Sequence, residues 1–179
     1  MRGVSASRFF FGRCKIKYHL PVYLHSANYA KEFQETIDYR ASFRLNLQCR
    51  DAICEAIDAH YRNDRLDEAA VREVVEQFGY ERTMVVLANT VRMKDWDRRF
   101  SPDNRKWADT IPCPCDMLGE RGRQFLTDKV HPGLVDLFIT QVRKDYEREH
   151  KPSVKAALKD NALQTAVEPK PRKAKEPER

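Results

Sequence analysis

The sequence predicts an all-α protein: a compact multi-helix body with an αα-hairpin around Gly79, followed by a disordered C-terminal tail. Three observations support this prediction. Apolar residues recur at helical spacing through most of residues 21–150, and no useful length of chain alternates apolar and polar residues. Apolar residues make up 41% of the 179 residues, which is enough for one core. From Lys151 onward, lysine, proline and glutamate dominate, which is typical of disorder.

Ser26 is the N-cap expected for a short first helix. Residues 36–61 place apolar side chains at helical spacing and predict the longest helix of the body. The turn-forming pair Asn63-Asp64 should end that helix. Asp67 then stands where an N-cap would start the next helix.

Gly79 occupies the place of a left-handed residue that ends a helix. A further helix should run over residues 80–94, through the apolar stretch MVVLANTV. Ser101 as N-cap and Pro102 at the first helical position predict another helix start. The segment PCPCDMLGERG reads as a loop, and residues 134–149 predict a last amphipathic helix.

The charge of the chain is unevenly distributed and separates three segments. Residues 1–20 form a basic extension with five basic and no acidic residues, and residues 151–179 form a tail with eight basic and four acidic ones. The helical domain, residues 21–150, holds 20 basic and 23 acidic residues, so the net charge of +6 comes from the ends. The basic composition is therefore weak support for nucleic-acid binding by the body.

The apolar runs are short, as in MVVLA at residues 84–88, so we expect no segment that crosses a membrane. Residues 1–20 lack the apolar stretch of a signal peptide, because charges resume directly after three phenylalanines. The five cysteines are an odd number. Without an export signal, we expect reduced thiols and a cytoplasmic protein.

The segment AAVREVVEQFGYERTMVVLANTV has the pattern of a helix-turn-helix, with a glycine turn between two apolar helices. A DNA-reading helix needs polar side chains along its outer face. The second helix offers few of them, such as Arg82 and Asn89, and is otherwise apolar. We favour an ordinary antiparallel or crossed core pair, with DNA reading as the alternative.

Cys113 and Cys115 raise the question of zinc, but structural zinc normally takes ligand pairs about two to four residues apart, and four ligands in all. One residue separates these two cysteines, and no second pair stands at a recognised interval. Asp95 and Asp97 stand two apart, as in some magnesium sites, but no nucleophile or base accompanies them. We therefore expect loop thiols, no metal or other cofactor, and no enzymatic activity.

The stretch LANTVRMKDWDRRFSPDNRKWA, residues 87–108, contains both tryptophans among many charged residues. Tryptophan and arginine dominate binding hot spots, and arginine also binds phosphates. The alternative is that the tryptophans belong to the core and the arginines to a solvated rim, with Trp107 the better core candidate. Our candidates for partner or nucleic-acid binding are Asn89, Arg92, Lys94, Trp96, Asp97, Arg98, Arg99, Asn104, Arg105 and Lys106.

Five blocks run in order from Pro21 to Arg143: PVYLHSANYA, YRASFRLNLQCRDAI, EQFGYERTMVVLANTV, DRRFSPDNRKWA and HPGLVDLFITQVR. In this order they resemble a small domain family carried by conjugative elements and phages of gut Firmicutes, without an assigned function. The family also occurs inside large polyvalent proteins, and members of this kind resemble anti-CRISPR proteins against type II effector nucleases. The resemblance supplies no catalytic motif, and the two ends of the chain lie outside it.

Two functions remain open. The resemblance implies a non-enzymatic anti-CRISPR inhibitor in a bacterial host cell. It would bind a type II CRISPR effector nuclease, its guide-loaded complex or double-stranded DNA. The other is a helix-turn-helix-like, DNA-binding accessory or regulatory protein of a mobile genetic element. The apolar second helix around Asn89 favours the inhibitor, because it offers little for reading bases.

Overall fold

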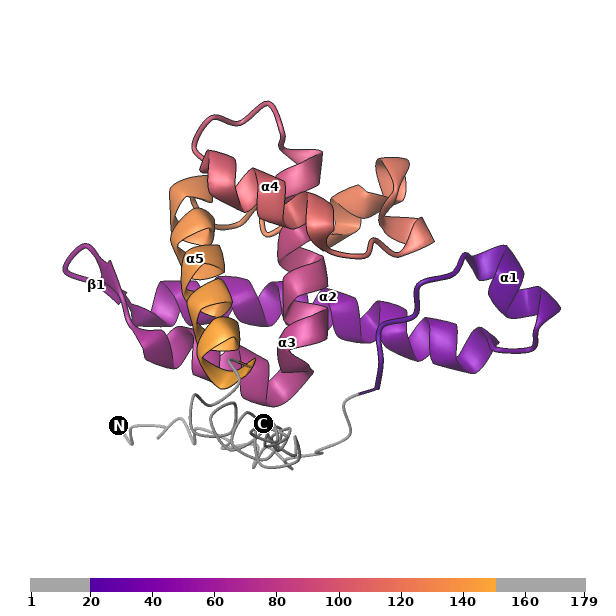
Figure 1. Cartoon of the computed structure of the whole chain (residues 1–179). Helices are drawn as coiled ribbons and strands as arrows, with labels where there is room; N and C mark the ends of the chain where they lie inside the picture. The colour runs from indigo at the N-terminus through magenta and orange to yellow at the C-terminus, as the bar shows by residue number, and fades with distance from the viewer. Residues whose placement is uncertain (1–19, 151–179) are drawn as a thin grey trace, which may run out of the picture. The chain divides into compact units, whose positions relative to one another are not determined.

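Helices account for most of the described chain, which covers residues 20–150 of a computed structural model (Figure 1). The predictions for the N-terminal extension up to residue 19 and for the tail from residue 151 lie outside the described residues. The elements are α1 (Ala27–Glu32), α2 (Thr36–His60), β1 (Tyr61–Arg62), β2 (Arg65–Leu66), α3 (Glu68–Met93), α4 (Pro102–Thr110), the 3-10 helices η1 (Cys115–Met117) and η2 (Gly119–Phe125), and α5 (Pro132–His150). The predicted all-α body is confirmed.

Side-chain caps start three of the helices where the sequence predicts them. The Ser26 hydroxyl accepts from the backbone N–H of Tyr29 at 3.2 Å at the start of α1. Asp67 accepts from the backbone N–H of Ala69 at 3.0 Å and opens α3. Ser101 caps α4, which begins with proline. Each cap satisfies a backbone donor that has no partner inside its helix.

Gly79 divides α3 into two halves that run in clearly different directions (Figure 1). Its φ of 77° is positive, as predicted, which a residue with a Cβ rarely adopts. Its ψ of 160° is extended rather than left-handed helical, so the chain bends sharply here and the helix resumes. The Thr83 hydroxyl donates to the Gly79 carbonyl at 2.8 Å and supports the bend. The helical pair around Gly79 is therefore a crossed one.

Two short strands replace the simple helix break predicted at Asn63-Asp64. β1 and β2 form an antiparallel hairpin in which Tyr61 pairs with Leu66. Asn63 and Asp64 have φ values of 49° and 59°, and two positive φ values in a two-residue loop are the signature of a type I′ turn. The sequence did not predict this hairpin, because a turn of this kind needs almost no strand length to close.

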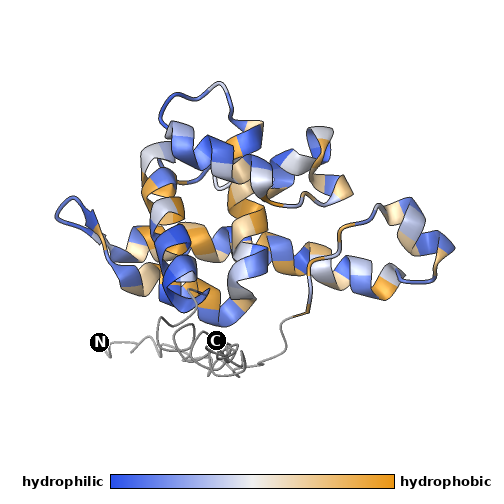
Figure 2. Cartoon of the chain, viewed as in Figure 1, coloured by the Kyte–Doolittle hydropathy of each residue, from blue (hydrophilic) through white to orange (hydrophobic). Residues whose placement is uncertain are grey.

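The core lies where α2, α3 and α5 come together, and Figure 2 shows their apolar segments gathered there. α2 packs against α3, and fully buried side chains include Ile53, Ile57, Leu87 and Phe138. The predicted contact between the longest helix and the pair around Gly79 is confirmed. Apolar surface contributes about 25 cal/mol of stability for each Å² that folding removes from water, so the side chains buried at this crossing stabilise the body.

The segment predicted as a loop after Ile111 is mostly 3-10 helix. η1 and η2 approach closely at Gly122, where an added Cβ would clash with the Met117 carbonyl oxygen. Phe125 of η2 is buried, and its ring meets that of Phe43 on α2 edge to face, with 4.9 Å between centroids. These contacts fix the segment on the body.

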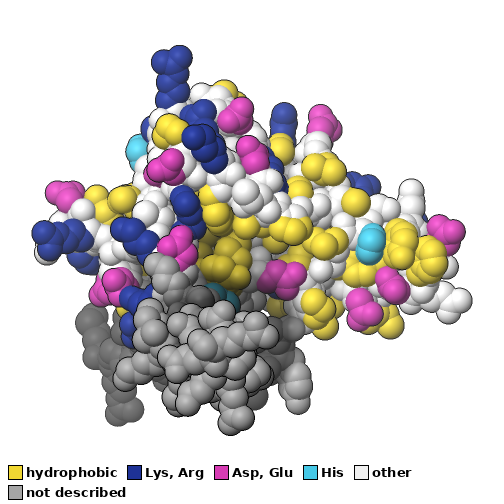
Figure 3. Space-filling model, in the orientation of Figure 1, with side chains coloured by type: hydrophobic (Ala, Val, Ile, Leu, Met, Phe, Trp, Pro, Cys, Tyr) yellow, Lys and Arg dark blue, Asp and Glu magenta, His cyan; other side chains and the backbone are white. Residues whose placement is uncertain are grey.

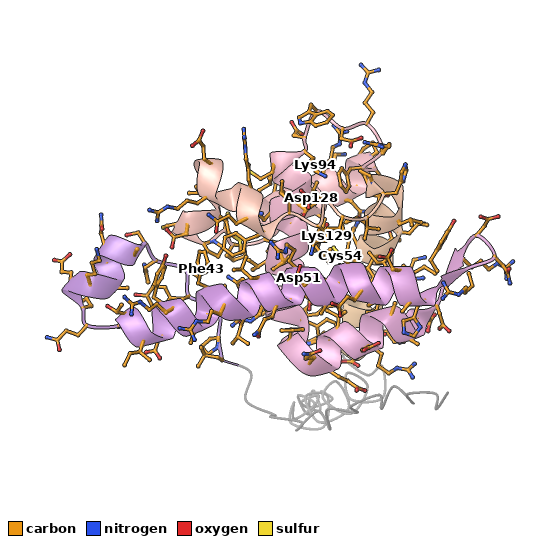
Figure 4. The ribbon with its side chains drawn as sticks, turned by 180° about the vertical axis from the view of Figure 1, so that it is seen from behind. Phe43, Asp51, Cys54, Lys94, Asp128 and Lys129 are labelled. Carbon is orange, nitrogen blue, oxygen red and sulfur yellow. The ribbon has the colours of Figure 1, made fainter. Side chains whose placement is uncertain are left out.

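The loop between η2 and α5 is tied to α2 by an ion pair. Figure 4 shows Asp51 and Lys129 side by side, and the Lys129 ammonium donates to Asp51 at 3.0 Å. α5 then begins at Pro132, slightly before the predicted start. The chain divides within α5 into two units, residues 1–143 and 144–179. Among the described residues, no helix has the length and apolar character to cross a membrane.

Candidate docking surface at the α3–α4 corner

The α3–α4 corner, residues 94–101, is a tight series of turns between two helices. The Lys94 N–H donates to the carbonyls of Thr90 and Val91 and ends α3. The Asp97 N–H donates to the Lys94 carbonyl at 2.8 Å, and the Phe100 N–H donates to the Asp97 carbonyl at 3.2 Å. The Phe100 side chain is buried in the core. The corner is therefore anchored at both ends.

Asp97, which the sequence analysis placed among the partner-binding candidates, is buried at the polar centre of this corner. Its side chain is only 5% exposed and accepts from the backbone N–H, Nε and Nη2 of Arg99, at 3.1, 2.8 and 2.7 Å. These hydrogen bonds lower the pKa of the Asp97 carboxyl to about 2. Asp97 and Arg99 satisfy each other inside the turn, which leaves the Asp97 carboxylate little surface for a partner.

Arg105 of α4 also stabilises the corner from the other side. Its guanidinium donates to the Asp97 carbonyl at 2.8 Å and lies 3.7 Å from the exposed carboxylate of Asp95. Each carboxylate of the Asp95/Asp97 pair therefore faces an arginine. This arrangement argues against the magnesium-like reading of the two acids.

Trp96 is the one exposed large hydrophobic side chain of the corner, with 76% of its surface accessible. Arg98 and Lys106 are also exposed. Lys94, labelled in Figure 4, is half-buried at the end of α3. Within residues 20–150, no ion pair is seen for Lys94, Arg98 or Lys106. Trp107, in contrast, packs against the core, with the Arg143 guanidinium 5.9 Å from its ring centre. The two tryptophans therefore have different roles, and Trp107 is the core member as expected.

Asn89 was a candidate contact residue, and the structure buries it instead. Its amide nitrogen donates to the Gly122 carbonyl at 2.9 Å and ties α3 to η2. Arg92 likewise turns inward and donates to the carbonyls of Ala108 and Ile111. These carbonyls lie at the C-terminal end of α4, where helices leave acceptors without partners. Both residues position elements of the body.

Asn104, another of the predicted contact residues, is completely buried, so its side chain is not on the surface of the corner. Its amide nitrogen donates to the Asp136 carboxylate at 2.7 Å and to the Thr140 hydroxyl at 3.1 Å. Its amide oxygen accepts from Arg143 at 2.6 Å. A residue near the start of a capped helix looked solvent-facing in the sequence, but α5 covers this side of α4.

The second half of α3 offers little to a DNA groove. Most of residues 82–91 are buried, including Arg82, which is only 2% exposed. The Arg82 guanidinium donates to the carbonyls of Ser42 at 3.0 Å and Leu20 at 2.6 Å, and also to Asn46. This burial removes the polar outer face that base reading requires.

Cys113 is half-buried and Cys115 is exposed, and neither is in a disulfide. Burial raises the pKa of the Cys113 thiol, which makes it a poorer metal ligand and nucleophile. In the part of the chain that the structure describes, no three His, Cys, Asp or Glu side chains come together as a metal site.

A second exposed region, which was not predicted, is formed by the rings of His25, Tyr29 and Phe33 on and beside α1. Their spacing of four residues was the available signal, since residues four apart share a helix face. Of this short helix, only the Ser26 cap was predicted.

A comparison with family models matches residues 22–147 to the family described as "Protein of unknown function (DUF3849)". The match covers more than two thirds of the chain, and the chain belongs to this family. Neither the curated proteins nor the solved structures contain a match.

Proposed function

We propose that this family member is a non-enzymatic anti-CRISPR protein that inhibits a type II CRISPR effector nuclease by stoichiometric binding. The docking surface is the α3–α4 corner, and the partner is the nuclease or its guide-loaded complex in the cytoplasm of a bacterial host. The observation that carries the proposal is Trp96, which stands 76% exposed on a corner held rigid by the Asp97–Arg99 hydrogen bonds.

An exposed tryptophan on a rigid turn suits a binding role better than a structural one. Burying an indole ring on association stabilises a complex strongly, and tryptophan and arginine are enriched in hot spots. Because the corner is already ordered by internal hydrogen bonds, little conformational entropy is lost on docking. Trp96 contributes little to the core of its own protein, since most of its surface faces solvent.

The charges around Trp96 favour a site beside bound nucleic acid. Arg98 and Lys106 are exposed without a seen ion-pair partner in the described chain, so they can contact phosphates. Arg99 is held by Asp97 and acts as a positioning residue. Inhibition by DNA mimicry fits less well, because 20 basic and 23 acidic residues leave the body with a small net negative charge.

The nuclease as partner rests on the resemblance to anti-CRISPR proteins, and the corner supplies the means of binding. A protein that acts by occupancy needs a surface of high affinity and no catalytic group. The same basic side chains would also bind the phosphates of double-stranded DNA held by the nuclease.

The test is a cleavage assay with purified, guide-loaded type II effector nucleases and a linear DNA target. We expect cleavage to stop as the added chain reaches about equal molar amount with the nuclease, and the two to co-elute in gel filtration. A regulator of the helix-turn-helix kind would instead shift one DNA sequence and leave every nuclease active. That result, with no co-elution, would exclude the inhibitor.

The matched variants are Trp96→Ala for the corner and Leu118→Ala as control. Leu118 is 63% exposed on the connection between η1 and η2 and lies outside the corner. Inhibition should weaken for the first variant and stay at the parental level for the second. Equal inhibition by both would place the docking surface elsewhere.

A further inference from the structure

Three rings beside α1 stack into a continuous surface, the aromatic stripe, made of His25, Tyr29 and Phe33. The rings of His25 and Tyr29 have centroids 4.2 Å apart and planes 20° apart, and Tyr29 and Phe33 repeat this at 4.2 Å and 28°. The four-residue spacing sets one ring above the next along the helix face. The stripe is thus a preformed apolar surface about one short helix in length.

The stripe is open to solvent and extends into further apolar side chains. Phe33 is 54% exposed, Ile37 at the start of α2 is 83% exposed, and Leu24 is also exposed. Figure 3 shows hydrophobic side chains gathered around one histidine on this face, with acidic side chains at their border. Exposed apolar groups collected in this way mark an interaction surface.

The stripe is rigidly connected to the body. The Tyr23 ring meets His25 edge to face at 5.9 Å and Tyr39 of α2 at 5.8 Å. The Tyr23 hydroxyl donates to the Glu35 carboxylate at 2.7 Å. The backbone of the chain before Tyr23 is fixed as well, because Arg82 donates to the Leu20 carbonyl at 2.6 Å.

The charges beside the stripe favour a basic occupant. Within residues 24–38, Glu32, Glu35 and Asp38 supply three carboxylates, and Lys31 is the one lysine or arginine. A single-stranded nucleic acid would stack on such rings, but its phosphates would meet these carboxylates. A second copy of the chain would bring two carboxylate-bearing borders together.

We propose that residues 8–17 of this same chain cover the aromatic stripe. This segment, RFFFGRCKIK, combines three phenylalanines and one isoleucine with four basic residues and no acidic one. It therefore matches both the apolar surface and the carboxylates beside it. Its docking removes the exposed rings and Ile37 from solvent and leaves Trp96 of the α3–α4 corner as the most exposed large hydrophobic side chain of the described residues.

The chain length between the segment and the stripe permits this contact. Phe11 is nine residues before Leu20, and an extended chain of that length reaches about 30 Å. α1 has six residues, so it is only about 9 Å long. The covalent link also raises the local concentration of the segment to about the millimolar range, so weak contacts suffice.

Limited trypsin digestion of the full chain, followed by mass spectrometry, tests the proposal. In the parent, cleavage after Arg8 and Arg13 should be slow because a docked segment is cut only when it opens. Two variants should be cut there at least about tenfold faster, since cleavage follows the open population: F33S/I37S, which alters the stripe, and F9S/F10S/F11S, which alters the segment. Leu118→Ser, an exposed change outside the stripe, should match the parent.

The second variant lies outside the helical body, so it keeps the test valid if the first unfolds. Cleavage after Arg8 at the same rate in the parent and both variants would overturn the proposal. The proposal would also be overturned if light scattering gave the parent the mass of two chains and F33S/I37S the mass of one. That result would show that a second copy covers the stripe. Binding of a single-stranded oligonucleotide that F33S/I37S abolishes would overturn it too. No nuclease is present, so the outcome is independent of the proposed function.

Discussion

The crossing of α2 and α3 and the α3–α4 corner both contain arginine, yet the two regions use it differently. At the crossing, Arg82 is buried and donates to backbone carbonyls of Ser42 and of the segment before α1. Burial lowers the pKa of the Arg82 guanidinium. The N–H groups of this guanidinium nevertheless find acceptors inside the fold. At the corner, Arg98 is exposed, and no acceptor for it is seen in the described chain. Partners inside the fold, rather than residue type, therefore separate structural arginines from those free to bind.

The crossing carries the largest expected effect. Arg82→Met keeps roughly the length of the side chain but removes its donors, and the carbonyls of Leu20, Pro21 and Ser42 lose a partner. We expect the free energy of unfolding to fall by about 3–4 kcal/mol, as for other broken buried networks. Urea denaturation measures the change. Arg98→Met is the control, and an equal loss in both variants would erase the distinction between the two regions.

Asn104→Ala is the next largest effect and tests the tie between α4 and α5. It removes hydrogen bonds to Asp136, Thr140 and Arg143 at once. The loss should be about 2–3 kcal/mol of unfolding free energy. The exposed neighbour Asp103 provides the control variant Asp103→Ala. If Asn104→Ala left stability intact but abolished partner binding, the original reading of Asn104 as a contact residue would return.

Acid titration sharpens the comparison within the corner itself. The Asp97 pKa is lowered from an ordinary 3.8 to about 2, mainly by hydrogen bonds from Arg99. The folded state therefore gains stability from this carboxylate above about pH 4 and loses it as the pH falls toward 2. Asp97→Asn should be less stable than the parent at pH 7, and the gap should narrow at pH 2. A gap that stays constant with pH would show that the carboxylate charge is not what orders the turn.

The smallest expected effect on stability is at the exposed side of the corner. Trp96→Ala and Arg98→Ala should each change the unfolding free energy by less than about 0.5 kcal/mol, since neither side chain is buried. Thermal unfolding followed by circular dichroism gives the value. A large loss for Trp96→Ala would mean that the ring packs within the protein.

Local signals allowed much of the fold to be predicted. The caps at Ser26, Asp67 and Ser101 and the positive φ of Gly79 depend on residues close in sequence. The β1–β2 hairpin was missed because its strands are too short to show alternation.

The candidate site was harder to predict, because which of its side chains are exposed depends on contacts between residues that are far apart in the sequence. Asn89 meets Gly122, and Asn104 meets α5, so neither could be recognised as buried from its neighbours. Trp96 differs, since it lies in a short turn between two helix ends and has little around it to pack against. Its exposure could be expected from the local pattern alone.

The most direct test of the central claim is the affinity of the W96A/R98A variant for a guide-loaded type II effector nuclease that the parent inhibits. Arg99 stays unchanged, so the hydrogen bonds to Asp97 that order the corner remain. Loss of a hot-spot pair of this kind weakens binding by about 2–4 kcal/mol, which isothermal titration calorimetry would record as a dissociation constant about 30 to 1,000 times higher. A dissociation constant equal to that of the parent, in a variant that is still helical, would contradict the claim that this corner is the docking surface.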